Sequence, residues 1–221
     1  MTHIALSYSR LTTFESCPSK FDYLYMSKLV KDVGNEHTEY GVRVHEALEK
    51  YGRDGTPLPE ESKHHKGIVD TILGLGGDQY FEYQMAIDIN FQPCDWFSPD
   101  VWFRGIADVL VVRGRTALIA DFKTGKIKDD PTQVKLFACL VMAHFPVVEK
   151  VKTALLWLKF NEITEDVFHR ANLKHMWDGI LPRIQYVQDT VQLGVYKTKP
   201  SGLCNYCAAK YMCSDARLWK K

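Results

Sequence analysis

The chain has 221 residues, of which 46% are hydrophobic, 12% aromatic and 25% charged, and its net charge is +1. This length supports one well-packed core and excludes two full-size domains, while the composition is typical of a soluble globular protein. The sequence contains no run of about eighteen uncharged apolar residues, so no membrane helix is predicted. The segment Met1 to Arg10 lacks the pattern of a secretory signal. We therefore expect a cytoplasmic protein, with no membrane partner, whose six cysteines bind metal or stay as buried thiols.

The charge is unevenly distributed along the chain. Residues 197–221 carry a net charge of +5, residues 1–31 carry +2, and the segment between them carries −6. Two basic ends around an acidic centre fit a nucleic-acid track beside a carboxylate metal site. Ordinary solvated surface charge is the alternative that this feature alone leaves open.

The first third of the chain predicts helices. Ser9 can cap a first helix, which the proline of Cys17-Pro18 interrupts. A second helix is expected over 39–51, where apolar residues recur on one face. Residues 56–77 indicate a loop and a further helix.

The centre of the chain predicts strands and a mixed sheet. The expected strands are 80–91, 101–112, 116–123 and 151–160, with a glycine-bearing hairpin loop over 113–115. The expected helices are 131–145 and 171–191, the second with a kink at Pro182. This order predicts an α/β fold with a central mixed sheet flanked by helices.

A carboxylate and a lysine stand two residues apart at the end of one predicted strand. Asp121 and Lys123 therefore project from the same face, and the hairpin brings Asp108 of the neighbouring strand beside them. Two carboxylates at one place are costly unless a divalent cation neutralises them, and Mg²⁺ or Mn²⁺ prefers such oxygen ligands. The lysine could then position or deprotonate an attacking water.

Three cysteines cluster in the aperiodic, basic tail. Cys204, Cys207 and Cys213 are separated by two and five residues, and Cys17 is the one other cysteine near a terminus. Three clustered thiolates need a fourth ligand to complete a metal site. The spacing by itself indicates zinc about as readily as iron–sulfur.

These motifs occur in an order that resembles the RecB-like branch of the PD-(D/E)xK nucleases. Residues 105–108 and 121–125 are similar to its Gly-x-x-Asp and Asp-x-Lys core. Residues 41–46 resemble the helix that carries its metal-binding histidine, and Gln133 resembles the glutamine of its Gln-x-x-x-Tyr motif. Residues 7–21 resemble the family's amino-terminal segment. The resemblance implies a restriction-endonuclease-like core.

The resemblance also implies roles for individual residues. It assigns the catalytic metal to His45, Asp108, Asp121 and the backbone carbonyl of Phe122. Lys123 would act on the water together with Asp121, and Gln133 would orient the substrate or the lysine. Two positions depart from the pattern, since Phe137 replaces the usual tyrosine after the glutamine and Phe122 stands where tyrosine is frequent. Neither change removes a metal ligand.

Some RecB-like nucleases, among them CRISPR-associated exonucleases and the AddB nuclease domain, hold a 4Fe–4S cluster with one cysteine before the core and three after it. The resemblance implies that Cys17, Cys204, Cys207 and Cys213 do the same. We therefore expect one nuclease domain over 1–221. Its catalytic core would be 32–196, and 1–31 with 197–221 would form a small iron–sulfur lobe that joins the two termini.

The resulting expectation is a metal-dependent DNA nuclease, with exonuclease action on single-stranded DNA or DNA ends more in keeping with the pattern than endonuclease action. Arg10, Tyr23, Lys126 and Lys128 are weaker candidates for DNA contacts, because cations beside aromatic rings suit single strands. A catalytically silent DNA-binding adaptor is the alternative. A partner protein from recombination, phage replication or CRISPR adaptation would fit the resemblance, as would an oligomer.

Overall fold

The computed structural model describes residues 4–32, 34, 36–127, 130–213 and 215. The chain forms two compact units. One is Asn35–Asp178, and the other combines Met1–Gly34 with Gly179–Lys221. This division assigns residues 179–196 to the unit of the two termini, whereas the sequence placed them in the core. None of the helices in the described ranges is long and apolar enough to span a membrane.

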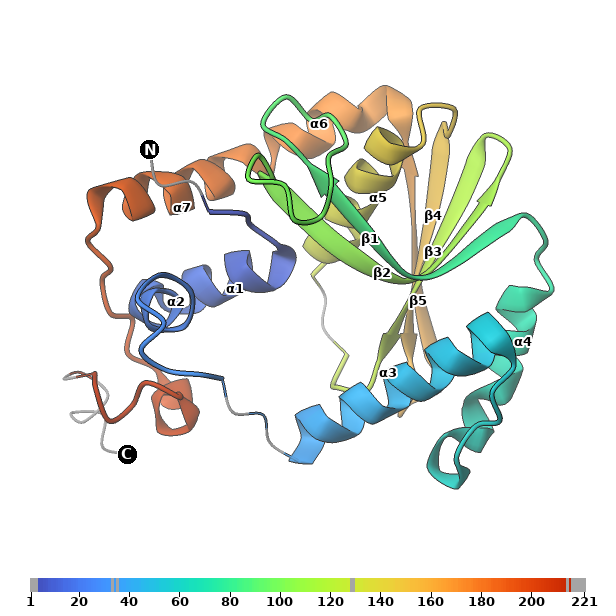
Figure 1. The fold of residues 1–221 in the computed structure, drawn as a ribbon, viewed down its shortest axis with the longest axis horizontal. Helices are drawn as coiled ribbons and strands as arrows, with labels where there is room; N and C mark the ends of the chain where they lie inside the picture. Colours follow the sequence, from blue (N-terminus) through green and yellow to red (C-terminus); the bar gives the residue numbers. More distant parts are fainter. Residues whose placement is uncertain (1–3, 33, 35, 128–129, 214, 216–221) are drawn as a thin grey trace. The chain divides into compact units, whose positions relative to one another are not determined.

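The unit Asn35–Asp178 is built on one five-stranded sheet (Figure 1). Its strands follow the chain order across the sheet, and every neighbouring pair is antiparallel except the third and fourth strands, which are parallel. The mixed sheet flanked by helices that the sequence predicted is therefore confirmed. The strands are β1 (Asp78–Ile87), β2 (Phe103–Arg113), β3 (Thr116–Lys123), β4 (Lys150–Trp157) and β5 (Glu162–His169).

The hairpin between β2 and β3 fixes the register of the site. Arg113 pairs with Thr116, and Gly114 has a φ of 57°, a conformation that glycine adopts without steric cost. The two-residue loop at 114–115 confirms the hairpin that the sequence predicted there. Because the loop is tight, the residues of β2 from Val109 to Arg113 each have a defined partner on β3.

Helices cover both faces of the sheet (Figure 1). Helices α3 (Glu36–Asp54) and α4 (Lys66–Leu73) lie on one face. Helix α5 (Thr132–His144) lies on the other face and connects the parallel strands β3 and β4. Apolar side chains of α3 and α4 share a buried core with those of β2, β3 and β4, and α5 is buried on most of its surface. The helical elements of this unit are α3 (Glu36–Asp54), η2 (Glu60–His65), α4 (Lys66–Leu73), α5 (Thr132–His144), η3 (Arg170–Asn172) and α6 (Leu173–Asp178).

Two features differ from the sequence prediction. The edge strand β5 was not predicted, because seven of its eight residues are exposed and its apolar residues show no burial pattern. The single kinked helix expected over 171–191 was wrong, since α6 ends at Asp178 and α7 (Leu181–Leu193) begins after a short break. Pro182 lies in the first turn of α7, where its missing N–H costs no helical hydrogen bond.

The second unit joins the two ends of the chain by direct hydrogen bonds. The Ser19 N–H donates to the carbonyl of Lys197, and the Ser19 hydroxyl donates to the carbonyl of Tyr196 at 2.7 Å. Arg183 of α7 forms an ion pair with Glu15 at 2.6 Å. The other helical elements of this unit are α1 (Tyr8–Ser16), α2 (Pro18–Phe21), η1 (Asp22–Met26) and η4 (Gly202–Tyr206).

Arg170 forms hydrogen bonds at the carboxyl-terminal end of α5 and with the segment that follows it. Its guanidinium donates to the carbonyls of Met142, Phe145 and Val148 at distances between 2.7 and 2.9 Å. The charge-assisted bond to Met142 satisfies a carbonyl in the last turn of α5, and those to Phe145 and Val148 hold the segment that follows the helix. We expect Arg170→Ala to lower the free energy of unfolding by roughly 2–4 kcal/mol, measured by urea denaturation.

The matched control for Arg170 is Lys174→Ala, which removes an exposed ion pair with Asp178. An exposed pair of this kind contributes at most about 0.5 kcal/mol. Equal stability of the two variants would contradict the proposed contribution of Arg170.

Candidate active site

The face alternation of β1 is interrupted at Glu82. The rings of Tyr80 and Tyr83 lie 4.8 Å apart on the α5 face, although regular alternation would place them on opposite faces. Between them, Phe81 packs on Gly52 of α3, where a Cβ atom would come within 2.2 Å of the ring. Glu82 has a φ of 49°, a strained conformation for a residue with a side chain. The kink directs two consecutive side chains, Phe81 and Glu82, towards α3.

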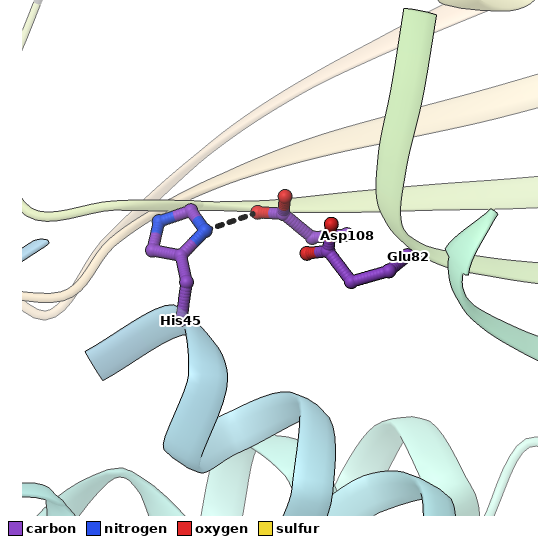
Figure 2. A group of neighbouring side chains, drawn as sticks. All are labelled: His45, Glu82 and Asp108. Atoms are coloured by element: carbon purple, nitrogen blue, oxygen red, sulfur yellow. Dashed lines mark ion pairs between the residues drawn. The ribbon is translucent and has the colours of Figure 1, made fainter. Parts of the chain in front are cut away.

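Three potential metal ligands meet at this kink. His45 of α3, Glu82 of β1 and Asp108 of β2 bring one ligand atom each to within 4.8 Å of the others (Figure 2). The His45 Nδ1 atom lies 3.3 Å from an Asp108 oxygen. That same oxygen accepts a 2.7 Å hydrogen bond from the backbone N–H of Phe122, which holds the Asp108 carboxylate in place. The nitrogen and oxygen donors of this set suit a divalent cation.

Asp121, Lys123 and Gln133 form a closed network of one ion pair and two hydrogen bonds beside this group. The Lys123 Nζ atom lies 2.6 Å from Asp121 Oδ2 and donates to Gln133 Oε1 at 2.9 Å. The Gln133 Nε2 group donates in turn to Asp121 Oδ1 at 2.9 Å. Asp121 is 3% exposed, so its charge depends on these partners. Gln133 lies in the first turn of α5, which carries it to the ends of Asp121 and Lys123.

Two carboxyl groups of the site, those of Glu82 and Asp121, have raised pKa values. Burial, followed by the charges of Asp108 and Glu49, raises the pKa of Glu82 to about 7. Burial and the charge of Asp108 also raise the pKa of Asp121, against the opposing effect of Lys123. Burial lowers the pKa of His45, but the hydrogen bond and charge of Asp108 outweigh it and leave that pKa raised. A divalent cation would relieve this repulsion between carboxylates.

The pKa shifts predict a pH-dependent metal affinity. A proton on Glu82, Asp121 or His45 must leave before the cation binds, so the affinity rises with pH through 7. For Mn²⁺ we expect binding at pH 6 to be at least about tenfold weaker than at pH 8, measured by calorimetry. Glu82→Gln should flatten this dependence, and an unchanged pH profile in that variant would show that Glu82 does not bind the cation.

The metal-ligand group lies in a cleft of about 900 Å³. A Cβ atom on Gly41 would lie 2.9 Å from the Thr124 hydroxyl oxygen, so α3 passes directly beside the loop after β3. A larger residue at position 41 would push the helix that carries His45 away from this loop. The lining residues are His37, Thr38, Gly41, Val42, His45, Glu46, Glu49, Glu82, Asp108, Thr124, Gly125, Lys126 and Lys159.

The structure brings together the residues that the sequence proposed for the metal and the water, namely His45, Asp108, Asp121, Lys123 and Gln133. It adds Glu82, which sequence reasoning missed. An acidic residue within an aromatic strand was the available signal, but the direction of its side chain depends on the kink at that residue.

The weaker DNA candidates are distributed over both units. Lys126 lines the cleft of the metal-ligand group. In the other unit, the Arg10 guanidinium lies 5.1 Å from the centre of the Tyr25 ring, and Tyr23 lines the cavity that contains the cysteines. Lys128 lies outside the residues that the structure describes.

All four cysteines proposed as cluster ligands line one cavity of about 150 Å³ in the unit of the two termini. Cys17 precedes α2, Cys204 and Cys207 lie within and directly after η4, and Cys213 follows them in the tail. Cys17 is thus brought to the other three despite the length of chain between them. All four thiols are free of disulfide bonds.

Comparison with known proteins places the chain in a family. The model of the PD-(D/E)XK nuclease superfamily matches residues 5–75 and 69–214. Among solved structures, SSO0001 is similar at 15% identity and a TM-score of 0.47, over 98% of this chain and 88% of that one. A "Putative exonuclease" from Eubacterium rectale is similar at 13% identity and a TM-score of 0.48, over 92% and 93% of the two chains. No curated protein matches significantly. The family match spans almost the whole sequence, and the chain therefore belongs to the PD-(D/E)XK nuclease superfamily.

Proposed function

We propose that this protein is a metal-dependent deoxyribonuclease that acts as an exonuclease on single-stranded DNA or DNA ends. The observation that carries the proposal is the meeting of His45, Asp108 and Glu82 with the Asp121–Lys123–Gln133 network. The exonuclease assignment rests on the RecB-like order of the sequence motifs.

His45, Glu82, Asp108 and Asp121 would hold Mg²⁺ or Mn²⁺, with the carbonyl of Phe122 as a further ligand. Their donors fit such an ion, since carboxylates, a carbonyl and one imidazole are accepted by Mn²⁺, and the oxygens by Mg²⁺. A bound divalent cation supplies charge stabilisation for the phosphate and a lowered pKa for a water molecule. The cation would in turn stabilise the ionised forms of Glu82 and Asp121, because it offsets the repulsion between carboxylates that contributes to their raised pKa values.

Lys123 would position the attacking water and offset charge on the phosphate. Its ammonium group is held by Asp121 and Gln133, so it is oriented before the substrate binds. Gln133 acts as a positioning residue, because its amide bonds to Asp121 at one end and to Lys123 at the other. This arrangement fixes the lysine relative to a metal ligand without a tyrosine at position 137, where the chain has Phe137.

The test is a cleavage assay on anaerobically purified protein with end-labelled single- and double-stranded DNA. We expect cleavage in Mg²⁺ or Mn²⁺ and none in EDTA, with a product ladder that shows the polarity. A Lys123→Met variant, purified identically, controls for contaminating nucleases. No cleavage with either metal, together with retained DNA binding, would reject the nuclease and favour an adaptor.

We further propose that Cys17, Cys204, Cys207 and Cys213 hold a 4Fe–4S cluster. Their common cavity supports this proposal, as does a hydrogen bond of 3.3 Å from the Ser201 N–H to the Cys204 sulfur. Such bonds stabilise thiolate ligands and tune a cluster's potential.

The order of the cysteines favours a cluster over zinc. Cys17 precedes the predicted nuclease core, and Cys204, Cys207 and Cys213 follow it. In this order the chain resembles the RecB-like nucleases that hold a 4Fe–4S cluster. Iron and sulfide analysis of anaerobic protein tests this assignment, and stoichiometric zinc would reject it.

A further inference from the structure

Two lysines stand on the same side of the active-site cleft. Lys126 follows β3 and Lys159 follows β4, and both line the cleft. Strands β3 and β4 are parallel, with Lys123 in register with Trp157, so the two loops leave the sheet at the same edge. The Leu158 N–H donates to the Lys123 carbonyl at 2.9 Å and fixes the start of the second loop. Lys159 is thereby tied to the strand that carries the active-site lysine.

These two lysines differ from several other lysines of the same unit. Among the described residues, neither has a carboxylate within 4.0 Å, whereas Lys50, Lys152 and Lys174 all do. The acids of α3 that line the cleft are already engaged, because Glu46 pairs with Lys50 and Glu49 pairs with Arg53. Lys126 and Lys159 are both exposed. Two exposed ammonium groups beside a carboxylate site are therefore available for an anion of the substrate.

We infer that Lys159, together with Lys126, binds phosphates adjacent to the one that is cleaved, and thereby positions the DNA strand across the ends of β3 and β4. This inference rests on the proposed nuclease function. On this inference, the cation would bind on the side of the cleft that carries the carboxylates and His45. The sugar-phosphate backbone of the DNA would bind on the side that carries the two lysines. An ammonium group suits this task because it binds phosphate as a point charge without reading sequence.

Cleavage of two substrates distinguishes binding of a neighbouring phosphate by Lys159 from a role of Lys159 in the chemical step. Lys159→Ala should raise KM for a single-stranded oligonucleotide about five- to tenfold and leave kcat nearly unchanged, because it removes one charged contact. The same variant should cleave bis(p-nitrophenyl) phosphate, which has no neighbouring phosphate, at the wild-type rate. Lys159→Arg should restore most of the oligonucleotide affinity. Equal loss on both substrates would overturn the inference, since Lys159 would then act at the scissile phosphate.

Binding measurements test the inference without cleavage. In an Asp121→Asn background, fluorescence anisotropy in Ca²⁺ should show weaker oligonucleotide binding for Lys159→Ala. The slope of log affinity against log salt should fall by about 0.7, the value for one phosphate of a single strand. The control is Lys174→Ala, whose exposed lysine pairs with Asp178 on α6. An unchanged slope overturns the inference even if the nuclease is active, and a wild-type protein that never cleaves overturns the function but not the binding result.

Discussion

The Asp121→Asn variant is expected to lose at least about a thousandfold of the wild-type cleavage rate while keeping its fold. Asp121 is buried and contacts both Lys123 and Gln133. Asparagine keeps the shape of the side chain but removes the charge that would hold both the cation and the lysine. Single-turnover cleavage with saturating Mn²⁺ measures the effect on the chemical step.

The fold should survive this change because burial already disfavours the charged form of Asp121, as its raised pKa indicates. Without bound metal, the ionised Asp121 therefore destabilises the wild-type protein above its native pKa, and this cost fades as the pH falls below it. The matched control is Asp178→Asn, which removes an exposed carboxylate that pairs with Lys174. Cleavage by Asp121→Asn within tenfold of that control would reject the assignment of Asp121 to the site.

The Cys204→Ser variant is expected to lose the visible absorbance of the cluster and several kcal/mol of stability in the unit of the two termini. Cys204 lies in η4 and shares its cavity with Cys17, which is 187 positions earlier in the printed sequence. A cluster bound by both would restrict the unfolded chain over nearly its whole length. Absorbance, iron content and thermal unfolding of anaerobic protein measure the loss.

Cys94→Ser is the control for this experiment, because Cys94 belongs to the sheet-containing unit and does not line the cysteine cavity. It should retain the absorbance and iron content of the wild type. A Cys204→Ser variant with an unchanged spectrum would contradict the cluster. Hydrogen bonds from Ser19 to Tyr196 and Lys197 already join the two ends, so part of this unit's structure should persist without a cluster.

The fold was predictable from the sequence where local patterns dominate. The hairpin at 114–115 and the strand Thr116–Lys123 agree with the prediction, because a short glycine-bearing loop permits few registers. Helix α5 also matches to within one residue at each end. The edge strand β5 was missed because its exposed residues carry no periodic apolar signal, and its strand conformation comes from pairing with β4.

The candidate site was likewise predictable from the sequence where its residues are close together in the chain. Spacing along the hairpin placed Asp108 near Asp121 and Lys123, since side chains two residues apart share a face. Glu82 was missed because regular alternation would have sent it and Phe81 to opposite faces. The positive φ at Glu82 redirects its side chain, and this strain is compatible with the fold only because α3 and β2 pack around it.

By itself, the sequence determined the α/β class, the hairpin with its Asp-x-Lys strand, and the cysteine spacing of the tail, because each depends on residues close together in the chain. Tertiary structure decided that Glu82 joins His45 and Asp108, that Gln133 links Asp121 to Lys123, and that Lys126 and Lys159 share one side of the cleft. These relations join residues from different strands and helices. Their distances follow from how the helices pack on the sheet and from one kinked strand, and no local pattern encodes them.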